Sequence, residues 1–199
     1  MRLPCLLSLW LLALPAHAQG PAAAPPTRAG LQRALEAHAR SAVQVQGPHK
    51  SGPGVIVGAG GQVLTSVEQV GLYEAQVQSD AGPQRAPVLM ASASLKVALL
   101  RLPGEGHPAA SVALLPSAGA ERPWLIGVVD AQGKRARAVA GRAAPSRGPF
   151  LRVPLALAPG SPLFDAQGRL VAVAVARRGP RACEALPLSA VKQQLVGTK

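Results

Sequence analysis

Residues 158–176 read APGSPLFDAQGRLVAVAVA, and the interpretation of the chain depends on them. Two apolar runs flank the turn 165–168, in which an aspartate can accept hydrogen bonds from the following backbone and a glycine can adopt a positive φ. The same Asp-Ala-Gln-Gly sequence recurs at 130–133. Both segments therefore predict tight β-hairpins. Ser161 stands between a glycine and a proline just before the first run, which raises the question of whether it is a nucleophile.

Outside this stretch, the chain is dominated by short segments in which apolar residues alternate with polar ones. A helix is expected from Leu31 to about Arg40, where leucine and alanine recur at helical spacing. Residues 54–67, GVIVGAGGQVLTSV, predict two strands around a glycine-rich turn. Further strands follow about every 8 to 12 residues, and residues 189–196 predict a closing helix. Many short strands with helices only at the ends predict an all-β barrel or sandwich.

The first residues have the features of an export signal. Residues 1–18, MRLPCLLSLWLLALPAHA, combine a basic start, a short apolar run and an Ala-His-Ala end, as in secretory signal peptides. Residues 19–30 are rich in Pro and Ala and are expected to be a flexible lead, and residues 31–199 are expected to form one domain. No later segment is long and apolar enough to span a bilayer. The sequence thus predicts an exported protein that is not a transmembrane protein.

Composition narrows the chemistry that the chain can perform. The net charge of +12 favours anionic partners. Nucleic acid is not an expected partner, because the basic segments lack interleaved aromatic residues. No cofactor or metal is expected, because no Cys/His cluster has ligand spacing and no glycine-rich motif has the form that binds nucleotides.

Cysteine usage excludes a disulfide-stapled fold. Cys5 lies in the signal peptide, so Cys183 is the one cysteine expected in the mature chain. A buried small hydrophobe is the favoured interpretation of Cys183. A disulfide with another chain is the alternative, since exported proteins meet oxidising conditions.

Four segments, in order, resemble the trypsin/chymotrypsin-like serine proteases, nearest the bacterial periplasmic HtrA/Deg branch. They are SGPGVIVGAGGQVLTSVEQV at 51–70, SLKVALLRL at 94–102, APGSPLFDAQGRLVAVAV at 158–175 and CEALPLSAVKQQLV at 183–196. The resemblance implies a chymotrypsin-like double β-barrel with short terminal helices, a boundary between the barrels near 103–120, and a cleft between them. It also implies a periplasmic or secreted protein of a bacterium.

The resemblance identifies positions for a catalytic triad, and none of them carries the residue that acyl transfer needs. Glu68 matches the histidine, and an offset of one residue gives Gln69 or Val67 instead. Lys96 matches the aspartate. If the alignment is anchored on PLFD at 162–165, Pro159 matches the serine and Ser161 lies past that position. If it is anchored on the preceding Pro-Gly, the serine and its neighbours are deleted and Ser161 stands just before Pro162; neither alignment places Ser161 at the nucleophile position. A histidine is needed to move the proton and a carboxylate to orient it.

No catalytic residues are therefore expected. The histidines of the mature chain lie in the leading helix and in loops, at His38, His49 and His107. Glu68 and Lys96 match neighbouring positions of the active enzymes, so we expect them to face each other as a salt bridge that fills the former catalytic cleft.

Three functions remain compatible with these residues. The first is a pseudoprotease that binds a peptide or protein, because active relatives pair substrate as a strand beside the segment matching 171–179. Ala174, Ala176, Arg177 and Arg178 are the candidate binding residues, and the arginines favour acidic partners. The second is an active serine endopeptidase with displaced catalytic residues. The third is a structural subunit of an envelope complex.

Overall fold

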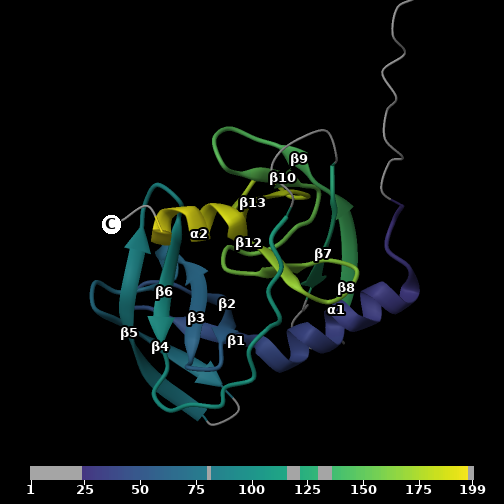
Figure 1. Ribbon diagram of the computed structural model, residues 1–199. Coiled ribbons are helices and arrows are strands. Elements are labelled where there is room, and N and C mark those ends of the chain that lie inside the picture. Colours follow the sequence, from purple (N-terminus) through teal and green to yellow (C-terminus); the bar gives the residue numbers. More distant parts are fainter. Residues whose placement is uncertain (1–23, 80–81, 116–121, 130–135, 197–199) are drawn as a thin grey trace, which may run out of the picture.

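The computed structural model describes residues 24–79, 82–115, 122–129 and 136–196 (Figure 1). The predicted signal peptide and the Asp-Ala-Gln-Gly turn at 130–133 lie outside the described residues. Within the described ranges, no helix has both the length and the apolar character that crossing a membrane requires.

The first sheet is a closed barrel with the strand order β1-β2-β3-β6-β5-β4. Each neighbouring pair is antiparallel. A one-turn 3₁₀ helix, η1 (Val67–Gln69), follows β3. The strands are β1 (Ala42–Gln46), β2 (Ser51–Gly58), β3 (Gln62–Ser66), β4 (Glu74–Ser79), β5 (Gly82–Ser92) and β6 (Val97–Arg101).

The second sheet has seven strands in the order β8-β7-β11-β12-β13-β10-β9. A helix precedes the first sheet, and another follows the second: α1 (Arg28–Ser41) and α2 (Leu188–Val196). The expected all-β fold with short terminal helices is confirmed. The strands are β7 (Trp124–Val129), β8 (Arg137–Arg142), β9 (Ala144–Pro145), β10 (Leu151–Val153), β11 (Pro162–Phe164), β12 (Leu170–Arg177) and β13 (Cys183–Pro187).

Alternation along the strands sorts the apolar residues into three cores. In β2 and β3, Ile56 and Val63 lie inside the first barrel. Their neighbours Val55 and Leu64 point the other way and join a core shared by both sheets and both helices. A third core lies within the second sheet and includes Val171 of β12. Because successive strand residues face opposite sides, the same strands build a barrel interior and the packing between the sheets.

Helix α1 begins earlier than the sequence predicts. The expected start was Leu31, whereas the helix begins at Arg28. Thr27 is the reason: its side chain accepts a hydrogen bond from the Gly30 amide at 3.3 Å and caps the first turn. Residues 28–30 therefore belong to the helix and not to the lead. Figure 1 shows α1 running beside β7 and β8, where Ala34 is fully buried.

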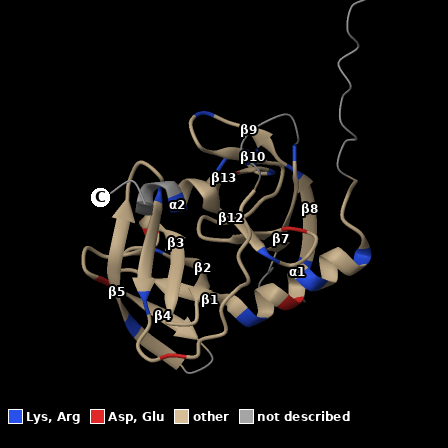
Figure 2. Cartoon of the chain, in the orientation of Figure 1, with Lys and Arg blue, Asp and Glu red and all other residues tan. Residues whose placement is uncertain are grey.

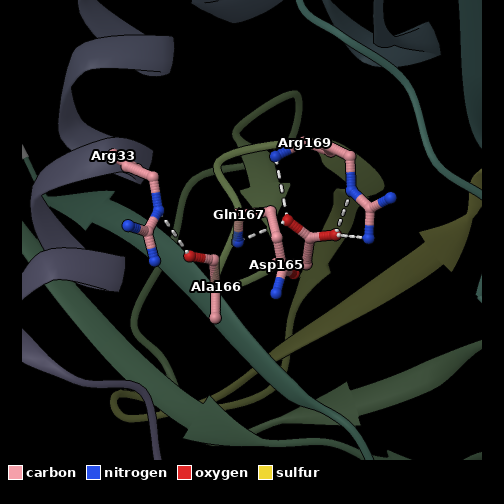
Figure 3. Close-up of polar contacts among 5 residues, drawn as sticks. All are labelled: Arg33, Asp165, Ala166, Gln167 and Arg169. Atoms are coloured by element: carbon pink, nitrogen blue, oxygen red, sulfur yellow. Dashed lines mark hydrogen bonds and ion pairs between the residues drawn. The ribbon is translucent and has the colours of Figure 1, made fainter.

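The turn 165–168 is built as its sequence predicts. Asp165 Oδ1 accepts hydrogen bonds from the amides of Gln167 and Arg169, each at 2.9 Å, and Oδ2 pairs with the Arg169 guanidinium (Figure 3). Gly168 has φ +77°. Arg33 of α1 donates from Nε to the Ala166 carbonyl at 3.0 Å. The hairpin between β11 and β12 is thus fixed internally and docked against α1.

We predict that Gly168→Ala destabilises the protein more than Gly179→Ala does. Both glycines have φ +77°, so both alanines incur the left-handed backbone cost of about 1–2 kcal/mol. A Cβ at Gly168 would also lie 2.9 Å from the Arg33 carbonyl oxygen, whereas a Cβ at Gly179 has nothing within 4 Å. We expect an additional loss of about 1 kcal/mol or more for Gly168→Ala in urea denaturation. Equal losses of unfolding free energy in the two variants would show that the contact between α1 and the turn 165–168 does not affect stability.

Candidate functional site

The candidate site lies where η1 of the first barrel meets the turn 158–161 of the second sheet. Ser66 caps η1 by accepting a hydrogen bond from the Glu68 amide at 3.4 Å. The tight 3₁₀ turn then directs neighbouring side chains differently. Glu68 is exposed, whereas Gln69 is buried with 4 % exposure. The side chain that faces the turn is therefore Gln69.

Both ends of the Gln69 amide are engaged. Nε2 donates to the Pro159 carbonyl oxygen at 2.5 Å, and Oε1 lies 2.5 Å from the Thr65 hydroxyl. Thr65 Oγ1 is also 2.9 Å from the Pro53 carbonyl oxygen. A single amide thus links β3 of the first barrel to the turn of the second sheet. The glutamine side chain is a neutral amide that does not titrate near neutral pH. Gln69 therefore cannot accept a proton as a general base.

The turn also packs tightly against the first barrel at Gly160. This residue has φ +90°, and a Cβ there would overlap the Pro53 carbonyl oxygen and lie 2.8 Å from Gln69 Oε1. Only glycine fits both the backbone conformation and the space.

The amides of the turn donate within the chain. Gly160 N donates to the Ala174 carbonyl at 2.7 Å, and Ser161 N donates to the Ala158 carbonyl at 3.1 Å. Ala174 N in turn donates to the Ser161 carbonyl at 2.9 Å. An oxyanion hole needs N–H groups that point at the substrate oxygen. In this arrangement, the amides of Gly160 and Ser161 already donate to carbonyl groups of the chain and do not point at a substrate oxygen.

Ser161 has no catalytic partner in the described part of the chain. Its residue is 7 % exposed, and no hydrogen bond among the described residues joins its hydroxyl to a histidine or a carboxylate. His49 is exposed in the loop before β2, and His107 Nε2 lies 3.0 Å from the Pro103 carbonyl. His38 belongs to α1. The triad positions inferred from the sequence therefore do not assemble around this serine.

The expected salt bridge between Glu68 and Lys96 is wrong. Glu68 Oε2 pairs with Lys50 Nζ at 2.7 Å on the surface, and Lys96 Nζ pairs with Glu184 Oε2 at 2.9 Å. The reason is local backbone geometry: η1 turns Glu68 outward, and Lys96 sits at φ +60° in the turn before β6. Its carbonyl accepts from the Val67 amide at 3.2 Å, while its side chain crosses to the second sheet.

Glu184 of β13 is a functional candidate that the sequence analysis missed. Its side chain is 3 % exposed, and its carboxylate binds two cations, Lys96 and Arg178, at 2.9 Å each. Lys96 Nζ also lies 5.2 Å from the centroid of the Phe150 ring. A charge inside the apolar segment 182–188 was the signal that could have identified it, because a buried carboxylate requires partners.

The environment of Glu184 favours its charged form. Burial alone raises the pKa of this carboxyl, but hydrogen bonds from Lys96 and Arg178 and the attraction of their charges outweigh burial. The pKa is therefore lowered from its ordinary value of 4.5. The ion pair to Lys96 connects the first barrel to the second sheet.

The expected peptide-binding residues fall into two groups. Ala174 is fully buried, and its backbone is occupied by the turn 158–161. Ala176 is half-buried, and Arg177 and Arg178 are exposed. Strand β11 begins at Pro162, so on the β11 side the partners of β12 end at Ala174. Among the described residues, no strand continues beside residues 175–177 on that side.

Cys183 is buried at the start of β13. Its exposure is 0 %, and it forms no disulfide in the structure. Burial raises the pKa of its thiol to about 11, despite backbone hydrogen bonds that act in the opposite direction. A thiol in this position packs as a small hydrophobe, and it cannot reach another chain without opening the sheet. In the described ranges, no three His, Cys, Asp or Glu side chains gather as a metal site would require.

The fold is shared with solved serine proteases. The Rv3671c protease of M. tuberculosis in its active form has a TM-score of 0.67 and 21% identity, over 94% of this chain and 93% of that one. Its inactive form has the same TM-score at 20% identity, over 89% and 98%. The Yersinia pestis serine endoprotease has a TM-score of 0.69 at 17% identity, over 86% and 66%. No protein-family model and no curated protein matches the chain.

These similarities confirm the predicted trypsin-like double β-barrel fold. They do not distinguish an active from an inactive protein, since both forms of one protease match with the same TM-score.

We predict that Gln69→Ala destabilises the protein by about 1–3 kcal/mol, because the Thr65 hydroxyl and the Pro159 carbonyl would lose a buried partner. The matched control is Gln78→Ala in β4, which is exposed and should change the free energy of unfolding by less than about 0.5 kcal/mol. Chemical denaturation measures both variants. Equal stabilities of the two variants would contradict the bridging role of Gln69.

We predict that Glu184→Gln destabilises the protein at neutral pH. We also expect the Tm of this variant to fall less steeply than that of the wild type as the pH is lowered. Because the folded pKa is lowered, the stabilisation by Glu184 is fully present above 4.5 and is lost as the pH falls through the lower folded value. Lys96→Met removes one of its two cations, so the loss should begin at a higher pH. The measurement is Tm as a function of pH.

The control for this experiment is Glu74→Gln. Among the described residues, the Glu74 carboxylate makes only an exposed pair with Arg85 at 3.8 Å, so its removal should leave the pH profile almost unchanged. If Glu184→Gln and Glu74→Gln gave the same profile, the buried network would not stabilise the fold.

Proposed function

We propose that this chain is an exported pseudoprotease that binds an extended segment of a partner protein beside β12 and does not cleave it. The observation that carries the proposal is the hydrogen bond from Gln69 to the Pro159 carbonyl. The side chain that faces the turn 158–161 is the amide of Gln69, which cannot act as a proton shuttle. Its hydrogen bond fixes the turn against the first barrel. Export to the periplasm or beyond a bacterial envelope is part of the same proposal.

The state of the turn 158–161 supports the absence of hydrolysis. Acyl transfer requires a nucleophile, a proton shuttle and free amide donors in one place. Here the amides of Gly160 and Ser161 donate to Ala174 and Ala158, and Ser161 is buried. The similar solved structures are described as serine proteases, so we carry over from them the binding of a polypeptide without the chemistry.

The end of β12 supports peptide binding. A peptide that adds to a sheet needs a strand with free backbone groups on one side. The turn 158–161 covers β12 up to Ala174, and residues 175–177 continue past it. The open segment of β12 is residues 176–177, since Val175 is buried with 1 % exposure, and it requires none of the triad residues. A partner strand could therefore be bound although the catalytic groups are missing.

We predict that an alternating Val-Glu octapeptide binds the protein through one edge of its backbone. In an extended peptide, the amides of alternate residues point to the same edge. N-methylation of either all Val or all Glu amides blocks one edge and leaves the other free. We expect one methylated peptide to lose at least about tenfold in affinity and the other to keep it, as measured by fluorescence anisotropy. Equal binding of both would contradict strand addition.

The alternative function, an active endopeptidase with displaced residues, is tested in the same samples. Mass spectrometry should find the bound peptide intact, and a fluorophosphonate probe should not label the protein, whereas trypsin is labelled in parallel. Labelling that disappears in Ser161→Ala would establish the alternative and overturn the pseudoprotease proposal.

A further inference from the structure

A basic hollow lies on the second sheet near the open segment of β12. It has a volume of about 400 Å³ and is lined by Ser146, Arg152, Arg177, Arg178 and Gly179. Figure 2 shows blue segments near β9, β10 and β13, at this end of the second sheet. Strand addition beside β12 uses backbone groups and does not require these arginines. The positive charge of the hollow therefore needs a separate explanation.

The cations around the hollow are only partly neutralised. Glu184 uses one carboxylate oxygen for Arg178 and the other for Lys96. Arg152 and Arg177 make no ion pair with the described residues. These four cations and one carboxylate carry a net charge of +3, and two of the cations, Arg152 and Arg177, have no ion-pair partner in the described part of the protein. The positive net charge around the hollow therefore favours the binding of an anion.

The strand register places Arg152 beside Glu184, whereas Arg177 lies one residue further along β12, opposite Cys183. Glu184 of β13 lies opposite Arg152 of β10 on one side and opposite Ala176 of β12 on the other. Residues directly opposite one another on neighbouring strands project from the same face of a sheet. Arg152, Glu184 and Ala176 therefore form a row across three strands. Ala176 is the smallest member of this row and lies next to the open edge.

We infer that the basic hollow binds a side-chain carboxylate of an acidic segment in the partner protein. This inference rests on the proposed function and adds the chemical class of the partner. A guanidinium fits a carboxylate with two parallel hydrogen bonds, and neither Arg152 nor Arg177 uses this capacity with an acid among the described residues. Arg178 is already held in place by Glu184 at 2.9 Å, so part of the site is ordered before the ligand arrives.

A peptide suits this position better than a phosphate or a lipid surface. Arg177 belongs both to the hollow and to the open segment of β12. A peptide can pair its backbone with that segment while one of its carboxylates enters the hollow, and a lipid headgroup or polyphosphate has no such backbone.

The test compares the alternating Val-Glu octapeptide with the alternating Val-Gln octapeptide, which has the same shape without charge. We predict that the Val-Gln peptide binds the wild-type protein at least about tenfold more weakly. The double variant Arg152→Gln/Arg177→Gln should lose most of this preference. The matched control Arg40→Gln/Arg101→Gln removes the same charge from exposed sites without ion pairs among the described residues and should keep it.

The outcomes separate this inference from the proposed function. If both peptides bind equally and backbone methylation weakens both, the strand site exists and the carboxylate site does not. If the preference for Val-Glu depends on Arg152 and Arg177 but methylation of either edge has no effect, the carboxylate site exists without strand addition. If neither peptide binds at about 1 mM, both proposals fail. Binding to phosphatidylglycerol vesicles that depends on the two arginines, without any peptide preference, would assign the hollow to anionic surfaces and overturn the inference.

Discussion

The close approach of the turn 158–161 to β2 constrains the whole junction between the two sheets. Gly160 lies so near the Pro53 carbonyl that any side chain would overlap it, and its φ of +90° excludes most other residues in any case. A turn this close leaves room for one planar amide between Thr65 and Pro159, and Gln69 occupies that place. On the side of the second sheet, Gly160 N donates to the Ala174 carbonyl at 2.7 Å, so the turn is held by both sheets.

The charges at the junction have a related origin. Glu184 lies on β13 beneath the contact between the sheets, and a carboxylate with 3 % exposure is stable there only with cations beside it. Lys96 reaches it from the first barrel and Arg178 from the hairpin that follows β12. With both of its oxygens bound to these two cations, Glu184 is not available to the neighbouring Arg152 and Arg177, which make no ion pair with the described residues. The positive surplus is therefore a consequence of where a single acid is buried.

The fold was accessible from the sequence because it depends on signals that act locally. Alternating apolar residues, the turn at 165–168 and the order of four segments were sufficient for the two sheets and the closing helix. The start of α1 was misplaced because a single side chain, Thr27, decides it. The site was less accessible. Glu68 and Gln69 are adjacent in sequence, and only the geometry of η1 determines which of them turns inward.

The pairing of Lys96 exposes the same limit at longer range. A sequence comparison places Lys96 beside Glu68, but its partner Glu184 lies 88 residues away on another sheet. Correspondence between positions in two proteins does not determine the direction of a long side chain, since four rotatable bonds and a positive φ separate the charge from the aligned backbone. The buried acid was the better guide, because it cannot remain charged without partners and so must attract the cations within reach. A search for isolated acids in apolar strands would have found this network without any knowledge of the catalytic positions.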